Sequence, residues 1–462
     1  MTFYEELDRY GANIALFEES RSISYASLKN ATEQFAQHVP AGKLVFVVCK
    51  NNVATVTGYL GLLQKKAVPA LIASTLASEL FDSLLKLYKP EYLWAPEGFY
   101  PGKIIYKTEG YALISTGYTQ EVALHKDLAL LLTTSGSTGS PKLVRQSYQN
   151  ISSNAASIAE YLHIQSTDRA ITTLPMNYTY GLSIIQSHLL MGAAVILTEC
   201  SIMEKEFWRL LKEERATTFG GVPYTYEMLK KLRFLRMDLP HIRYLTQAGG
   251  KLGKEMHAEF AEGLRAKGID FIVMYGQAEA TARMSYVPAD QAAEKAGSIG
   301  LPIPGGKISL VDGENHIIET ADTVGELVYE GANVTLGYAN CPEDLSLGDE
   351  RQGVLFTGDM AKRDADGYYY IVGRKKRFLK MFGNRVNLDE LEGLLHKDGF
   401  EVACAGEDDH LCLFSTHDDE ALLVQRAAEL TGINRSAFSY RQIPRIPRNE
   451  SGKVLYSQLI ID

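Results

Sequence analysis

A run of nine residues rich in hydroxyl groups and glycine is where this sequence most clearly carries chemistry. Residues 134–142 read TSGSTGSPK and follow an apolar stretch typical of a buried strand. Glycines let backbone N–H groups turn inward, hydroxyls donate hydrogen bonds and a lysine adds charge, so the loop can surround a polyphosphate; these residues are Thr134, Ser135, Gly136, Ser137, Thr138, Gly139 and Lys142. The spacing fits neither GxxxxGK[ST] nor GxGxxG. We therefore predict an anion-binding loop, with a surface turn as the alternative.

The elements that must position this loop alternate between strand and helix. Strand patterns occupy 43–49, 67–72, 170–174, 193–197, 217–222 and 244–246, and helical apolar spacing occupies 28–38 and 54–64. Such alternation predicts parallel sheets covered on both faces by helices, an α/β fold.

Composition indicates an ordinary globular protein with more than one core. The chain has 462 residues, of which 46% are hydrophobic and 22% are charged, so two or three folding units are expected. A net charge of -9 without a basic tract argues against nucleic-acid binding. The five cysteines lack CxxC spacing, and no apolar run reaches roughly 18 residues. We therefore expect reduced thiols, no integral membrane association and a cytoplasmic protein.

The loop resembles the signature TSGSTGxPKG of the adenylate-forming (AMP-binding) ligases. This superfamily comprises acyl- and aryl-CoA synthetases, the amino-acid-activating domains of peptide synthetases, and luciferases. Only the last glycine of the signature differs, being Leu143 here, and five further segments resemble the family's motifs in the family's order. The resemblance implies a large multi-sheet N-terminal domain that binds ATP and the acid, residues 1–376, and a small mobile α+β C-terminal lid, residues 377–462.

Two segments correspond to the family's pocket for the acid. Residues 174–182 (LPMNYTYGL) resemble LPLFHxxGL, with Tyr178 in place of the usual histidine. By resemblance Tyr178, Tyr180 and Gly221 line the acid pocket, although core packing is the alternative for both tyrosines. The segment holds no acidic side chain to pair with a substrate ammonium, which disfavours an α-amino acid.

Other segments correspond to the family's nucleotide and metal site. Residues 275–281 (YGQAEAT) resemble YGxTE, in which the tyrosine packs on adenine and the glutamate holds Mg2+. The family's threonine is Ala278 here, and Thr281 is expected to replace its missing hydrogen bond to phosphate. The resemblance assigns the nucleotide to Gly249, Gly250, Tyr275, Gly276, Gln277, Ala278, Asp359 and Arg374, and the metal to Glu279. Asp359 in FTGD would accept hydrogen bonds from both ribose hydroxyls, and Arg374 would contact ribose or phosphate.

The C-terminal segments correspond to the family's hinge and closing motif. Residues 447–453 (PRNESGK) resemble the motif whose lysine, Lys453 here, bonds the substrate carboxylate and the α-phosphate. Arg377 stands at the hinge position, where relatives usually have Asp or Lys. Because a hinge acts through its backbone, we expect the backbone at Arg377 to matter more than the side chain. Tyr456 stands where relatives often have a basic residue.

The resemblance implies a ligase with Lys453, Glu279 and Lys142 as catalytic residues. ATP, Mg2+ and a small-molecule carboxylic acid would give an acyl-adenylate, and a thiol would then displace AMP. The thiol belongs either to CoA or to the phosphopantetheine arm of a separate carrier protein, which leaves a carrier-loading enzyme as the alternative. A third reading is a nucleotide-binding protein that has lost catalysis, suggested by Tyr178, Ala278 and Tyr456.

Overall fold

The computed structural model describes residues 2–120, 122–133, 142–382, 384–448 and 454–459. Contacts divide the chain into two compact units. Unit 1 holds most of the chain up to Lys307 together with Glu330–Leu355, and unit 2 holds Ile308–Tyr329 and the chain from Phe356 onward. In the described part of the chain, no helix is both long and apolar enough to cross a bilayer.

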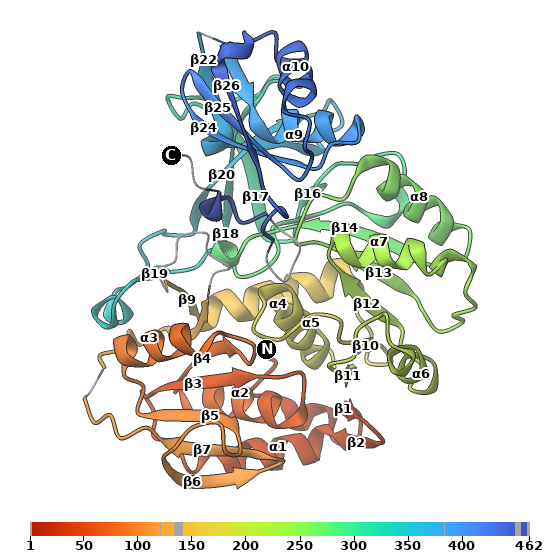
Figure 1. Cartoon of the computed structure of the whole chain (residues 1–462). Helices are drawn as coiled ribbons and strands as arrows, with labels where there is room; N and C mark the ends of the chain where they lie inside the picture. Colours follow the sequence, from red (N-terminus) through yellow and green to blue (C-terminus); the bar gives the residue numbers. More distant parts are fainter. Residues whose placement is uncertain (1, 121, 134–141, 383, 449–453, 460–462) are drawn as a thin grey trace. The chain divides into compact units, whose positions relative to one another are not determined.

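The first sheet of unit 1 has eight strands in the order β19-β9-β8-β4-β3-β5-β7-β6 (Figure 1). Its central strands β5, β3, β4 and β8 run parallel, and antiparallel strands complete both edges. The strands are β3 (Leu44–Cys49), β4 (Val68–Ala73), β5 (Tyr92–Pro96), β6 (Lys103–Thr108), β7 (Tyr111–Ser115), β8 (Leu128–Thr133), β9 (Leu143–Ser147) and β19 (Gly337–Ala339).

Helices cover both faces of this sheet. Every residue of β3 (LVFVVC) is buried, as a central strand between two helical layers requires. One face packs on α3 (Ser78–Tyr88), and the other on α2 (Val53–Lys65), which is backed by α1 (Tyr25–Ala36). The side chain of Asn52 caps α2 by accepting a hydrogen bond from Thr55 N, which fixes where the helix starts.

The second sheet has nine strands in the order β16-β15-β14-β13-β12-β10-β11-β1-β2. Its parallel strands run from β1 to β14, and helices α6, α7 and α8 pack on one face around a core that contains Phe207, Tyr226 and Phe260. The elements are β1 (Ile14–Glu18), β2 (Arg21–Ser24), α4 (Tyr148–Tyr161), β10 (Arg169–Ile171), α5 (Thr179–Leu190), β11 (Ala194–Leu197), α6 (Lys205–Glu213), β12 (Thr218–Gly221), α7 (Pro223–Lys231), β13 (Tyr244–Gln247), α8 (Lys254–Arg265), β14 (Asp270–Tyr275), β15 (Ser285–Tyr286) and β16 (Leu301–Pro302).

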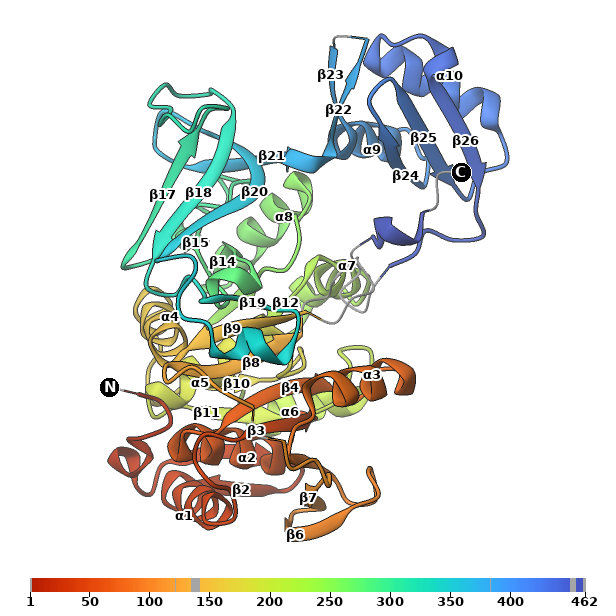
Figure 2. The same ribbon diagram turned by 90° about the vertical axis from the view of Figure 1, so that its left-hand side faces the viewer.

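Unit 2 contains most of a four-stranded sheet and a small C-terminal α+β fold. The sheet has the order β17-β18-β20-β21, and the C-terminal fold packs α9 and α10 on β24-β25-β26 beside the hairpin β22-β23 (Figure 2). The elements are β17 (Gly306–Val311), β18 (Gly325–Gly331), β20 (Val354–Arg363), β21 (Tyr369–Arg374), β22 (Phe378–Met381), β23 (Asn384–Asn387), α9 (Leu388–Lys397), β24 (Val402–Glu407), β25 (His410–Ser415), α10 (Glu420–Thr431) and β26 (Phe438–Gln442).

Short 3-10 helices connect these elements. They are η1 (Leu7–Tyr10), η2 (Phe234–Arg236), η3 (Ala278–Ala280), η4 (Ala289–Gln291), η5 (Pro342–Ser346), η6 (Lys375–Arg377), η7 (Arg435–Ala437) and η8 (Tyr456–Gln458).

The predicted α/β class and the predicted strands of unit 1 are confirmed. The six expected strand ranges coincide with β3, β4, β10, β11, β12 and β13 to within three residues at each end. The boundary expected between residues 376 and 377 stays a prediction, since contacts group Ile308–Tyr329 and 356–376 with the C-terminal fold.

Candidate active site

Glu279 lies in η3, in the turn that follows β14, and its backbone is firmly held. The backbone N–H of Thr335 and the guanidinium of Arg351 both donate to the Glu279 carbonyl oxygen, each at 3.0 Å. The Tyr338 hydroxyl donates to carboxylate oxygen Oε1. The first two contacts therefore fix the backbone of Glu279, and the third fixes its carboxylate.

Tyr338 connects Glu279 to Lys142. It belongs to β19, whose pairing with β9 sets Tyr338 opposite Val144, and Lys142 immediately precedes β9. The Lys142 ammonium lies 3.9 Å from the centroid of the Tyr338 ring, and the Arg351 guanidinium lies 4.8 Å from it. Both cations are attracted to the ring electrons. Burial raises the pKa of Tyr338 to about 12, and the nearby Glu279 carboxylate contributes to this increase in pKa. The phenol therefore stays protonated and donates a hydrogen bond to the carboxylate.

This arrangement suits a Mg2+ site completed by substrate. Glu279 offers a hard oxygen donor held in place, which Mg2+ prefers. Among the described residues, no group of three or more His, Cys, Asp or Glu side chains is arranged so that it could hold a metal ion by itself. Mg2+ characteristically takes one or two carboxylates and fills its other positions with phosphate oxygens and water. The residues present therefore fit the ion that the family motif implies.

Gly276, in the YGQAEAT segment, lies where there is no space for a side chain. A Cβ at Gly276 would lie 1.8 Å from the carbonyl oxygen of Ala282, so no other residue fits there. Gln277 donates to the Tyr275 hydroxyl at 3.0 Å. The expected replacement of the phosphate hydrogen bond by Thr281 is not made, because its buried hydroxyl donates to the Asn333 carbonyl at 2.7 Å.

The two predicted pocket tyrosines lie at the start of α5, close to glycines. A Cβ at Gly249, whose φ is +83°, would lie 2.6 Å from the Tyr178 hydroxyl. A Cβ at Gly220 would lie 2.7 Å from the Tyr180 hydroxyl, which bonds Thr246 Oγ1 at 2.8 Å. These glycines therefore make room for the tyrosine side chains. Gly221 instead packs close to Thr225, and Gly250 close to Pro223.

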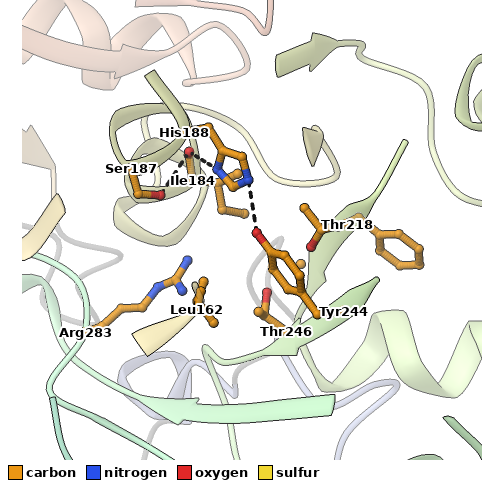
Figure 3. Close-up of a pocket in the computed structure, with 10 residues that line it drawn as sticks. Leu162, Ile184, Ser187, His188, Thr218, Tyr244, Thr246 and Arg283 are labelled. Atoms are coloured by element: carbon orange, nitrogen blue, oxygen red, sulfur yellow. Dashed lines mark hydrogen bonds between the residues drawn. The ribbon is translucent and has the colours of Figure 1, made fainter. Parts of the chain in front are cut away.

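A narrow pocket lies between α5 and strands β12 and β13 (Figure 3). The space between its atoms totals about 220 Å³, of which about 10 Å³ is open to the centre of a water molecule. Its lining combines apolar walls with hydroxyl, imidazole and guanidinium groups, contributed by Leu162, Ile184, Ser187, His188, Thr218, Phe219, Gly220, Tyr244, Thr246 and Arg283. Sequence analysis placed none of these in the acid pocket, although Gly220 adjoins Gly221 and Thr246 bonds Tyr180.

His188 is neutral in this pocket. Burial lowers the pKa of His188 to about 4. Its Nδ1 lies 2.8 Å from the Ile184 carbonyl, which only accepts, so Nδ1 carries the proton. Nε2 then accepts from the Tyr244 hydroxyl at 3.1 Å (Figure 3).

Unit 2 brings together the two predicted ribose residues. Asp359 on β20 and Arg374 on β21 are directly paired across the sheet, and Arg374 Nε lies 2.6 Å from the Asp359 carboxylate. Asp359 is buried, at 3% exposure, so its carboxylate is held in one orientation. A carboxylate held this way is suited to accept hydrogen bonds from two neighbouring hydroxyls.

The side chain of Arg377 makes several contacts within the C-terminal fold, which the sequence analysis did not anticipate. Its guanidinium lies 2.8 Å from Asp389 and 2.6 Å from Glu392, and it also donates to the Cys404 carbonyl. The ring centroid of Tyr456 lies 3.8 Å from it, and the Tyr456 hydroxyl donates to Glu392 at 2.8 Å. Burial alone would lower the pKa of Arg377, but Glu392, Tyr456 and Asp389 raise it above its usual value. Arg377 is therefore a largely buried anchor of the C-terminal fold, with 12% of its side chain exposed.

Several predicted site residues lie outside the described residues. They are Thr134, Ser135, Gly136, Ser137, Thr138, Gly139 and Lys453, whose roles stay predictions.

Comparison with known proteins identifies the family. Residues 3–339 match the family described as AMP-binding enzyme. The chain belongs to this AMP-binding enzyme family. The resemblance drawn from the sequence motifs is thereby confirmed.

Named relatives of this family member include two CoA ligases. It is 29% identical to sulfoacetate–CoA ligase of Cupriavidus necator, over 72% of this chain and 66% of the relative. It is 27% identical to oxalate–CoA ligase of Arabidopsis thaliana, over 71% and 66% respectively. The matched region thus spans slightly less than two thirds of these relatives.

A solved structure supports the fold over the whole chain. The o-succinylbenzoate coenzyme A synthetase of Bacillus subtilis in complex with AMP superposes with a TM-score of 0.80, covering 100% of this chain and 98% of that one at 21% identity. The likeness confirms a large multi-sheet α/β fold with a smaller C-terminal part.

Proposed function

We propose that this protein is an AMP-forming acid–thiol ligase that makes a CoA thioester. The observation that carries the proposal is the Glu279–Tyr338–Lys142 arrangement, which sets a fixed carboxylate and an ammonium beside one aromatic ring in an AMP-binding enzyme. The names of the relatives support CoA over a carrier protein as the thiol. A protein that had lost catalysis would have no need to keep Glu279 so firmly oriented.

The first half-reaction joins the acid to AMP. A carboxylate oxygen attacks the α-phosphorus of ATP, and the bond to the bridging oxygen of the β-phosphate breaks to release pyrophosphate. Mg2+ held by Glu279 would offset negative charge on the phosphates. Lys142 and Lys453 would place positive charge where it builds up on the α-phosphate oxygens. Asp359 and Arg374 would hold the ribose in unit 2.

The second half-reaction transfers the acyl group. The CoA sulfur, having lost its proton, attacks the acyl carbon, the bond from that carbon to the phosphate oxygen breaks, and AMP leaves. Holding both reactants in one site supplies the orientation on which such a step depends. Arg377 remains the proposed hinge about which the lid turns between the two steps.

We also propose a cytoplasmic location. Five cysteines, all free of disulfides, support it, since reducing compartments keep thiols in this state.

Acid-dependent pyrophosphate exchange tests the proposed function. Labelled pyrophosphate is incubated with the protein, Mg-ATP and a panel of fatty, aryl, hydroxy and amino acids, with Glu279→Gln as the control variant. We expect label in ATP with a subset of the acids and at least a tenfold loss in the variant. Product mass with CoA and with a holo-carrier protein then identifies the thiol. Absence of exchange with every acid, or full exchange by Glu279→Gln, would contradict the proposal.

A further inference from the structure

Arg283 is a buried cation to which the described residues offer no acidic partner. It follows Glu279 by four residues, and only 2% of its surface is exposed. One guanidinium nitrogen, Nη1, lies 3.2 Å from the Tyr161 hydroxyl and 2.9 Å from the Met274 sulfur. Nε and Nη2 are buried and make no hydrogen bond within the described part of the chain. The guanidinium packs 4.8 Å from the centroid of the Tyr180 ring.

Four described groups that interact electrostatically with Arg283 are His188, Tyr161, Tyr180 and Tyr244. Asp168, which acts on His188 and Tyr244, is itself paired with Arg243 at 2.6 Å. Burial raises the pKa of each tyrosine above its usual value and lowers the pKa of His188, so all four are neutral near pH 7. Arginine keeps its charge at any physiological pH. A buried, unpaired guanidinium is costly, and one in a pocket is typical of a site for an anion.

The guanidinium faces the pocket between α5 and strands β12 and β13. Figure 3 shows the Arg283 side chain pointing from its backbone toward Leu162 and Ser187, which line the pocket, and lying below His188. Adjacent Nε and Nη2 groups form the fork that binds two oxygens of a carboxylate or sulfonate. The pocket is too narrow for a long acyl chain, since only about 10 Å³ of its space is open to the centre of a water molecule.

We propose that the acid activated by this protein carries a second anionic group, a carboxylate or a sulfonate, that binds Nε and Nη2 of Arg283. This rests on the proposed function, because the second anion is taken to belong to the acid that is adenylated. It makes Arg283 a specificity residue: a dianionic acid completes the buried ion pair, whereas an uncharged or apolar tail leaves the guanidinium unpaired.

Matched acids of equal shape and different charge test the proposal. The pairs are succinate and succinamate, glutarate and glutaramate, and sulfoacetate and sulfamoylacetate, each assayed by pyrophosphate exchange. For at least one pair we expect the dianion to be preferred by about 100-fold in kcat/KM, the usual size of effect when a buried charge is left unpaired. The carboxylate and sulfonate pairs distinguish the two kinds of anion.

Variants of Arg283 connect the preference to this side chain. Arg283→Met should reduce the preference to within a few-fold of unity, and Arg283→Lys should keep part of it. Arg169→Met is the matched control, since the Arg169 guanidinium also packs on a ring, 5.0 Å from the centroid of Phe17, and does not line the pocket. Preference for the uncharged acids, or an unchanged preference in Arg283→Met, would overturn the proposal.

Binding measurements keep this inference separate from the proposed function. If no acid supports exchange, the proposed function fails, and the pocket is then judged by thermal unfolding of the protein with succinate, glutarate or sulfoacetate. A dianion that raises the unfolding temperature of the parent and not of Arg283→Met supports the anion site. Equal shifts in both proteins, or none in either, would overturn it.

Discussion

Replacing Arg377 by glutamine is expected to loosen the C-terminal fold of unit 2. The side chains of Arg377 and Glu392 are each 12% exposed, and Asp389 completes the group. Glutamine would leave both carboxylates without their cation, and removing one partner from a buried ion pair costs about 3–5 kcal/mol. Arg426→Gln is the control, because its pairs with Asp398 and Glu429 are exposed and are worth about 1 kcal/mol or less.

Hydrogen exchange followed by mass spectrometry measures this effect locally. Peptides covering α9 and β24 should exchange about 10²–10⁴-fold faster in Arg377→Gln than in the parent, and less than about tenfold faster in Arg426→Gln. Equal protection in the two variants would refute the anchoring role.

The hinge is tested by Arg377→Pro, which fixes φ, with Arg377→Gln as the reference variant. The rate of thioester formation should be much lower in Arg377→Pro than in Arg377→Gln, whereas the rate of pyrophosphate exchange should be the same in both variants.

Three further outcomes are expected. Tyr338→Phe removes the hydroxyl that orients the Glu279 carboxylate, so the Mg2+ concentration for half-maximal pyrophosphate exchange should rise about tenfold. The control is Tyr370→Phe, which removes a hydroxyl bonded to Asp364 and should leave this Mg2+ concentration unchanged. Burial lowers the pKa of His257 to about 4, so the stability that neutral His257 contributes is complete above pH ~6.5 and is lost as the pH falls toward 4. Urea titrations should show that His257→Asn loses about 3 kcal/mol less free energy of unfolding than the parent over that range. Lys453→Ala should slow adenylate formation by ~10²–10³-fold and slow thioester formation from supplied acyl-adenylate much less; equal losses in both steps would remove Lys453 from its assigned role.

The strands of unit 1 could be predicted because the residues of each strand form a recognisable pattern within a few positions of sequence. A central parallel strand is buried on both faces, so its sequence is a continuous apolar run, as in Leu44–Cys49. Motifs such as YGQAEAT could be recognised because close packing at Gly276 and the carboxylate at position 279 leave little choice of residue.

Contacts between distant segments could not be predicted this way. Tyr338 bonds Glu279 across 59 residues of sequence, and only the pairing of β19 with β9 brings the phenol to that place. In the sequence, nothing distinguishes Arg283 from an ordinary surface cation, because the burial of a charge depends on tertiary packing. For Arg377, a local signal existed: Asp389 and Glu392 stand three residues apart on α9, so they share a helix face.

Transfer of oxygen from the acid to AMP tests the central claim most directly. An acid labelled with 18O in its carboxylate is incubated with the protein, Mg-ATP and CoA, and the nucleotide products are analysed by mass spectrometry. If the carboxylate attacks the α-phosphorus and the thiol then displaces AMP, one labelled oxygen appears in AMP and none in pyrophosphate. Label in inorganic phosphate together with ADP, or AMP formed without label, would contradict the account.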